Sequence, residues 1–248
     1  MAGAAGPSAG VSVQGRKRFY KDVGVVAQDG GYMINLDGKT LRTPHRNSLV
    51  LPSSALAHAI AFEWESQHSR IQPSAMPMMT LACTAIDIAE ERREGTVTEL
   101  MRFLDTDTVL FPDDPREAEK GLVTRQRLHW TPLVNWMREN FGDLNVGTEM
   151  VVQPHPTETK EAVRSELESL DAFRLTAVES LAAGCKSIII PLALHRRQIT
   201  VLEALEAARV EEEHQVKQWG LVEGNHDVDR LHLTAQVSAA SLFLWLAE

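Results

Sequence analysis

The sequence contains few cysteines and no long apolar run. Its two cysteines, Cys83 and Cys185, lie far apart and outside any Cys-x-x-Cys motif. This pattern is typical of buried thiols in a reducing compartment and does not indicate a redox or nucleophilic role. No apolar stretch reaches the roughly 18 residues that a membrane-spanning helix needs. We therefore expect no membrane span.

Basic residues are in the minority. The 248-residue chain has 25 Lys and Arg against 34 Asp and Glu, a formal net charge of -9. Nucleic acid binding needs clustered basic side chains, so we expect no nucleic acid partner. Most of the acidic excess follows Pro112, where 14 basic residues stand against 22 acidic ones. An acidic surface there favours a basic partner, and a merely solvated face is the alternative.

The chain also lacks a convincing motif for nucleotide or nucleophile chemistry. Cys185 separates Gly184 from Lys186, so this segment lacks the spacing of a phosphate-binding loop. Gly-x-Gly-x-x-Gly does not occur, and the Gly-x-Ser-x-Gly match at residues 6–10 lies in an Ala-, Gly- and Ser-rich segment without the preceding strand that a nucleophile elbow needs. We therefore expect no nucleotide, no cofactor and no small-molecule substrate.

Asp105 and Asp107 stand in an Asp-Thr-Asp-Thr sequence, as in the nucleophile loop of phosphatases that form an aspartyl-phosphate. In those enzymes a buried strand precedes the loop, whereas residues 98–104 have helical spacing. The chain also lacks the repeated strand–helix units of that fold. The structural alternative, in which these side chains cap a helix end and a turn, fits the sequence better.

The N-terminal part predicts a small antiparallel sheet. Residues 1–17 are rich in Ala, Gly and Ser, and we expect a disordered tail or the remnant of a targeting segment. Asp37-Gly38 is typical of a type I′ hairpin turn, in which both central residues need positive φ. The surrounding apolar residues predict strands at 23–27, 32–36, 39–42 and 49–51.

After the last of these strands the apolar spacing changes from two to about 3.6 residues, which is typical of helices. Ser53 or Ser54 is expected to cap the first helix, with Leu56, Ile60 and Trp64 on one side. Further helices are predicted at 79–89, 97–104, 117–129, 132–140, 159–183, 186–195, 200–219 and 229–246, with a β-like run at 108–111 and a strand or linker at 146–153.

A cluster of Pro and Asp at residues 112–115 is the predicted domain boundary. It separates a β-rich N-terminal domain with helices, residues 18–112, from an α-helical domain, residues 113–248. The expected fold class is α+β, with a small N-terminal antiparallel β unit followed by a larger, mainly α-helical domain.

Residues 211–227 combine acid, imidazole and indole groups on a predicted helix. At 3.6 residues per turn, Glu211, Gln215 and Trp219 share one face, and a glycine follows to end the helix. A polar face with one large aromatic side chain suits protein recognition. Trp64 and Trp219 are therefore the candidate interface anchors, and for Trp64 a place in the core is the alternative.

The same segment contains two Glu-x-x-His pairs, Glu211 with His214 and Glu223 with His226. A carboxylate-bridged di-iron site uses one such pair from each of two facing helices, together with two further glutamates. The sequence indicates no such glutamates, so we predict no resident metal. A metal-dependent hydrolase or oxidase using this cluster is the alternative function.

Several motifs occur together in an order that resembles one known family. They are Arg18-Phe19-Tyr20-Lys21, residues 36–44 around Asp37-Gly38, Glu63-Trp64-Glu65-Ser66-Gln67, Phe103-Leu104-Asp105-Thr106-Asp107-Thr108, residues 130–136, and residues 211–227. In this register they resemble the mitochondrial ATP synthase assembly factor 2 family, the chaperones of the α subunit. The resemblance extends from about residue 18 to the C-terminus.

This resemblance implies a mitochondrial matrix chaperone without enzymatic activity. Such a chaperone holds the unassembled α subunit of the F-type ATP synthase and prevents its aggregation until the β subunit replaces it. The tryptophans would supply buried area and the carboxylates would set the orientation of the partner. The partner-binding residues that the resemblance implies are Glu63, Trp64, Asp105, Asp107, Glu211, Glu212, Glu213, Trp219, Glu223, His226 and Asp227.

Overall fold

The computed structural model describes residues 15–116, 119–147, 154–220 and 226–248, apart from the side chains of Glu90 and His226. Its contacts divide the chain into two compact units. The first comprises Met1–Ile88 with Leu246–Glu248, and the second comprises Ala89–Trp245. The boundary predicted at residue 112 therefore falls inside the second unit. Most of the predicted tail, residues 1–14, lies outside the described residues.

The first unit contains a three-stranded antiparallel sheet in the order β1, β2, β3. Strand β1 (Val23–Gln28) pairs along its whole length with β2 (Gly31–Leu36), which pairs with the short β3 (Lys39–Thr40). Asp37 and Gly38 join β2 to β3 with φ angles of 49° and 79°. Positive φ at both positions confirms the predicted hairpin turn.

The strand predicted at 49–51 is wrong in extent, because within this segment Leu51 forms only an isolated bridge with Tyr32. The two residues exchange backbone hydrogen bonds of 2.9 and 2.8 Å. Pro52 follows at once and lacks an N–H group, so the ladder ends there. A Cβ atom at Gly31 would lie 2.4 Å from the Leu51 carbonyl oxygen, so this close approach requires glycine.

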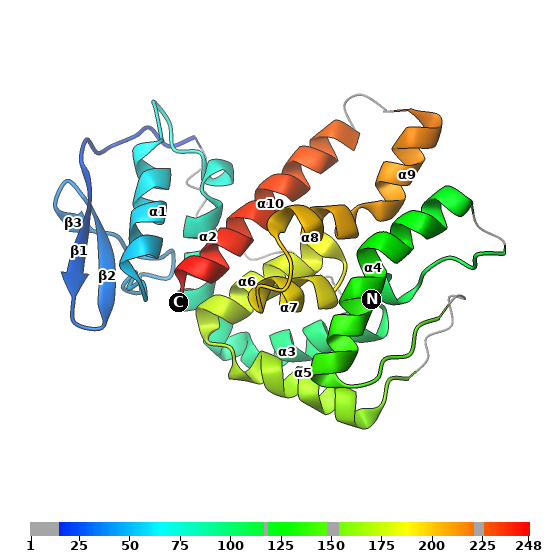
Figure 1. Cartoon of the computed structure of the whole chain (residues 1–248). Coiled ribbons are helices and arrows are strands. Elements are labelled where there is room, and N and C mark those ends of the chain that lie inside the picture. The colour runs from blue at the N-terminus through cyan, green and yellow to red at the C-terminus, as the bar shows by residue number, and fades with distance from the viewer. Residues whose placement is uncertain (1–14, 117–118, 148–153, 221–225) are drawn as a thin grey trace, which may run out of the picture. The chain divides into compact units, whose positions relative to one another are not determined.

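Helix α1 (Ser54–Glu65) packs on β1 and β2 and covers one side of the sheet (Figure 1). The Ser53 hydroxyl accepts a hydrogen bond from the Leu56 backbone N–H and caps the helix, as one of the two predicted alternatives requires. The expected apolar side is buried, including Leu56 and Ile60. A short 3₁₀ turn, η1 (Pro73–Ala75), and α2 (Pro77–Asp87) complete the unit.

The second unit is helical in its described parts. Its elements are α3 (Ala89–Asp105), the 3₁₀ turn η2 (Thr108–Leu110), α4 (Lys120–Phe141), α5 (Thr157–Ser169), α6 (Ala172–Cys185), α7 (Ile189–His195), α8 (Val201–Ala208), α9 (Val210–Trp219) and α10 (His226–Leu246). A small N-terminal sheet followed by helices confirms the predicted α+β fold class (Figure 1). Residues 148–153 of the predicted strand or linker lie outside the described residues.

Two long predicted helices are each divided in two. Residues 159–183 form parts of α5 and α6, which separate where the Asp171 side chain accepts a hydrogen bond from the Arg174 N–H and starts a new helix. Residues 200–219 form α8 and α9, which separate at Arg209, where φ is −119° and ψ is 18°. A side-chain cap interrupts the continuous helical pattern at Asp171, and the non-helical backbone of the buried Arg209 interrupts it at the second point.

The predicted helix restart at Pro132 and the predicted β-like run at 108–111 are also wrong. Helix α4 continues through Pro132, held by buried Trp130 and Leu133 on either side. Packing offsets the lost backbone hydrogen bond of the proline. The β-like run forms η2 because the Asp107 carboxylate accepts a hydrogen bond from the Val109 N–H and closes a tight turn.

The core of the second unit centres on α6 and α7. Residues Ile189–Leu194 of α7 are all buried. Helix α10 packs closely on α6, where the side chains of Leu233 and Gln236 lie 3.2 and 3.3 Å from the Cβ position of Gly184. Gln236 also donates a 3.0 Å hydrogen bond to the Ser180 carbonyl. Among the described residues, no helix is both long and apolar enough to cross a bilayer.

Candidate partner-binding surface

Helix α9 presents one side to α4 and the opposite side to solvent. Its first residue, Val210, is buried, and one turn later His214 places Nε2 2.9 Å from the Glu119 carboxylate. The Cβ position of Gly121 lies only 3.3 Å from the His214 ring, so the small glycine admits the imidazole. The helix ends at Gly220, whose φ is 84°.

The solvent side carries the three side chains that the sequence places on one face. Glu211, Gln215 and Trp219 are all exposed, and we call them the α9 outer face. The Trp219 indole is 76% exposed, which is unusual for so large an apolar group. Exposed indoles of this kind are typical anchors of protein–protein interfaces.

The charges around the α9 outer face are only partly neutralised. Glu212, which borders this face, lies 3.8 Å from the Lys186 ammonium, whereas Glu213 lies on the opposite side of the helix, 3.5 Å from the Arg209 guanidinium. The pKa of Glu211 is raised, first by desolvation and then by the nearby Asp113 and Glu212 carboxylates. Repulsion among these acids favours an incoming cation, so the face suits a basic partner surface.

The described residues contain no group of three or more His, Cys, Asp or Glu side chains that could hold a metal ion. His214 instead faces Glu119. Glu223 and the His226 side chain, which form the second predicted pair, lie outside the described part of the chain. The described half of the cluster therefore does not support the metal-dependent alternative.

Asp227 follows at the start of α10 and is half-buried. Its carboxylate accepts a 3.0 Å hydrogen bond from the Val228 backbone N–H. Asp105 lies at the end of α3, where it forms a 2.6 Å ion pair with Lys160 of α5. The predicted partner-binding role of both carboxylates stays a prediction, and the Lys160 pair already gives Asp105 a contact within the fold.

Asp107 is completely buried, with 0% exposure. One carboxylate oxygen accepts hydrogen bonds from the Ser187 hydroxyl and from the Ile188 and Ile189 N–H groups, and thereby caps α7. Burial raises its pKa to about 6. The structural alternative considered for this residue, a capping role, matches its contacts.

Glu63 and Trp64 are also buried, each 7% exposed. The Glu63 carboxylate accepts 2.8 Å hydrogen bonds from the Met78 and Met79 N–H groups at the start of α2. Burial raises the pKa of Glu63 to about 7. Trp64 packs edge-on against the Tyr20 ring at 5.5 Å. These contacts place Trp64 in the core, the alternative left open for it, and its predicted partner contact remains untested.

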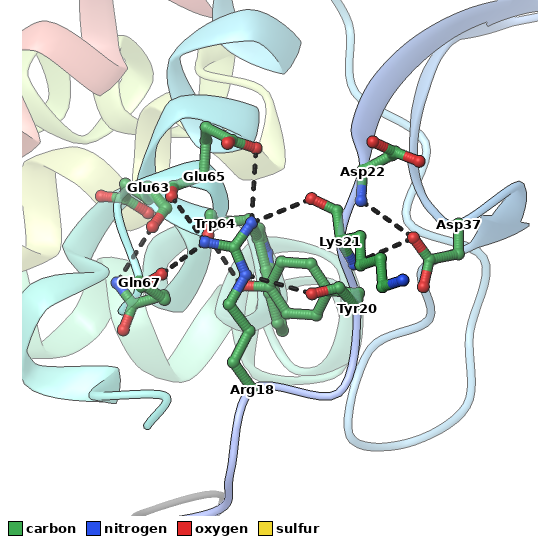
Figure 2. A network of polar contacts seen from close by, with 9 residues as sticks. All are labelled: Arg18, Tyr20, Lys21, Asp22, Asp37, Glu63, Trp64, Glu65 and Gln67. Carbon is green, nitrogen blue, oxygen red and sulfur yellow. Dashed lines mark hydrogen bonds and ion pairs between the residues drawn. The ribbon is translucent and has the colours of Figure 1, made fainter. Parts of the chain in front are cut away.

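Sequence reasoning did not assign a role to Arg18, which connects several of the motifs. Figure 2 shows its guanidinium directed at the end of α1, where it donates to the carbonyls of Glu65 at 3.1 Å and Gln67 at 2.5 Å. It also donates to the Tyr20 and Lys21 carbonyls and stacks 4.6 Å above the Tyr20 ring. The sequence contained one indication of this role, because Arg18 and residues 63–67 both lie in motifs that resemble the family.

The turn residue Asp37 extends the same network (Figure 2). Its carboxylate accepts hydrogen bonds of 3.0 and 2.9 Å from the Lys21 and Asp22 N–H groups. These bonds lower the pKa of Asp37. Three motifs that lie apart in the sequence therefore meet in one structural cluster, while the α9 outer face belongs to the second unit.

Comparison with known proteins gives a consistent result. The family model described as ATP12 chaperone protein matches residues 17–138. The mitochondrial protein atp12 of Schizosaccharomyces pombe is 30% identical over 236 residues, which cover 91% of this chain and 81% of that protein. The mitochondrial protein ATP12 of Saccharomyces cerevisiae is 25% identical, over 87% of this chain and 79% of its own length.

A solved structure agrees with these relatives. The crystal structure of Atp12 from Paracoccus denitrificans superposes with a TM-score of 0.86 at 31% identity, covering 94% of this chain and 98% of that one. The chain belongs to the ATP12 chaperone family.

Proposed function

We propose that this chain binds the unassembled α subunit of the mitochondrial F-type ATP synthase in the matrix. It covers an apolar assembly surface of that subunit and prevents aggregation until the β subunit takes its place. The coarser part of this function, a chaperone of ATP synthase assembly, follows from membership of the ATP12 chaperone family. The mitochondrial names of the two yeast relatives support the compartment.

The observation that carries the proposal is the α9 outer face. Its indole is 76% exposed, and the Glu212 carboxylate that borders this face is only loosely paired, 3.8 Å from the Lys186 ammonium. Burying one such indole supplies binding energy, while the carboxylates orient a basic partner surface and speed encounter. Such a contact protects an aggregation-prone surface and still allows displacement by the natural neighbour.

Light scattering of purified α subunit tests the proposal. The wild-type chain is expected to suppress aggregation, and added β subunit is expected to release it from the complex. Trp219→Ala should weaken protection, whereas Phe62→Ala, which removes an aromatic side chain that is 71% exposed in the first unit, should not. An α subunit that aggregates equally fast with and without the wild-type chain would overturn the proposal.

A further inference from the structure

A groove in the second unit lies on the other side of α9. Helices α4, α8, α9 and α10 line it, and its volume is about 360 Å³. Leu202, Leu205 and Val210 provide apolar lining, and charged side chains surround them. At 100° per residue, the groove residues Val210, Glu213 and Lys217 lie on the side of α9 opposite the α9 outer face.

The groove is basic although the chain is acidic. Four Arg and Lys side chains line it against two carboxylates, whereas the whole chain carries a net charge of -9. Glu213 is already 3.5 Å from Arg209 and 3.9 Å from Arg230. Within the described ranges, Arg125 and Lys217 form no ion pair with a carboxylate. Two cationic groups are therefore available to an incoming acid.

The groove also contains an uncovered apolar side chain. Leu202 on α8 lines the groove and is 65% exposed. An exposed leucine in a groove is typical of sites that receive the apolar face of a helix. The charge on the rim then selects which helices bind.

We infer that this groove binds an amphipathic, acidic segment of the client, with its apolar face on Leu202 and its carboxylates at Arg125 and Lys217. Charge complementarity selects this occupant over a basic segment, which the same cations repel. The identity of the client rests on the proposed function, whereas the chemistry of the groove does not. The client then makes two contacts with this chain. A basic surface of the client binds the α9 outer face, and an acidic segment of the client binds the basic groove.

The experiment uses the full chain and two fluorescent helical peptides of equal length. Both carry leucine along one face, and their flanks carry glutamate in one peptide and lysine in the other. We expect the acidic peptide to bind about tenfold more tightly or better, with a difference that shrinks as salt rises. Equal affinity for both peptides, or no binding of the acidic one, would overturn the inference.

Substitutions then locate the site. Arg125→Glu and Lys217→Glu are each expected to weaken binding of the acidic peptide by about tenfold, and Leu202→Ser by a comparable factor. Arg127→Glu is the matched control, because it reverses an exposed charge on the same helix outside the groove. All variants should melt like the wild type. A control variant that loses as much affinity as Arg125→Glu would show a nonspecific charge effect and overturn the assignment.

The two proposals fail separately. If the wild-type chain protects the α subunit but does not prefer the acidic peptide, the groove assignment is wrong and the proposed function stands. If it prefers the acidic peptide through Arg125 and Lys217 but leaves the α subunit to aggregate, the proposed client is wrong and the groove chemistry stands.

Discussion

The Ser187 hydroxyl donates a 2.9 Å hydrogen bond to the carboxylate of Asp107, a residue 80 positions earlier in the chain. The carboxylate also accepts from the N–H groups of Val109, Ile188 and Ile189. A single buried side chain thus joins η2 to the start of α7. Asp107 lies in a family motif, and its four contacts within the fold give the aspartate at this position a structural role.

Replacing Asp107 tests this structural role. Asp107→Ala removes the acceptor from four buried donors, so we expect a loss of about 3 kcal/mol or more in the free energy of unfolding. Asp107→Asn keeps one acceptor oxygen and should cost less. Urea unfolding followed by circular dichroism gives both values. An alanine variant as stable as the wild type, but defective in binding the α subunit, would instead indicate a direct partner contact.

The raised pKa of Glu63 predicts that the stability of the fold depends on pH. Its pKa rises from 4.5 to about 7 because burial disfavours the charged form, against the two backbone hydrogen bonds. The folded state therefore keeps a proton that the unfolded state releases above pH 4.5. The stabilising contribution is fully present below that pH and is lost as the pH rises through about 7.

The matched variant Glu63→Gln cannot titrate at this position. Between pH 5 and pH 8 we expect the wild type to lose stability relative to the variant by on the order of 2 kcal/mol. Free energies of unfolding in urea, measured at both pH values, provide the comparison. The same pH slope in both proteins would contradict the assignment.

Arg18 should be difficult to replace even by lysine. Its guanidinium donates to four backbone carbonyls in directions that one ammonium group cannot reproduce. We expect Arg18→Lys to lower the free energy of unfolding by about 1 to 2 kcal/mol. Arg16→Lys is the control, because Arg16 is exposed and its guanidinium stacks on Phe19, which is exposed as well. Thermal melts that shift equally for both variants would contradict the role of Arg18.

Trp219 should matter for binding and not for stability. Its indole is 76% exposed, so Trp219→Ala removes little buried area and should change the free energy of unfolding by less than about 0.5 kcal/mol. If the indole anchors the α subunit, the affinity should fall by 2 kcal/mol or more, roughly thirtyfold. Calorimetric titration of wild type and variant measures the difference. A variant with unchanged affinity would exclude the indole as an anchor.

The sequence correctly predicted features that depend on interactions between residues close together in the chain. Asp37-Gly38 adopts positive φ because a two-residue hairpin requires it, and Ser53 caps α1 because its hydroxyl reaches the Leu56 N–H. The break at Asp171 comes from a side-chain cap, and the break at Arg209 and the continuity of α4 through Pro132 occur where Arg209, Trp130 and Leu133 are buried. The spacing of apolar residues along the chain shows neither the cap nor the burial.

For the candidate site, too, the sequence predicted some features and the tertiary structure was needed for others. The sequence by itself placed Glu211, Gln215 and Trp219 on one face, because helical geometry alone determines which residues share a side. Only the tertiary structure decided that this face is exposed while Glu63, Trp64 and Asp107 are buried, and that the opposite side of α9 borders a basic groove. Burial and charge clustering depend on which distant segments meet, and the local spacing of residues along the chain does not reveal those contacts.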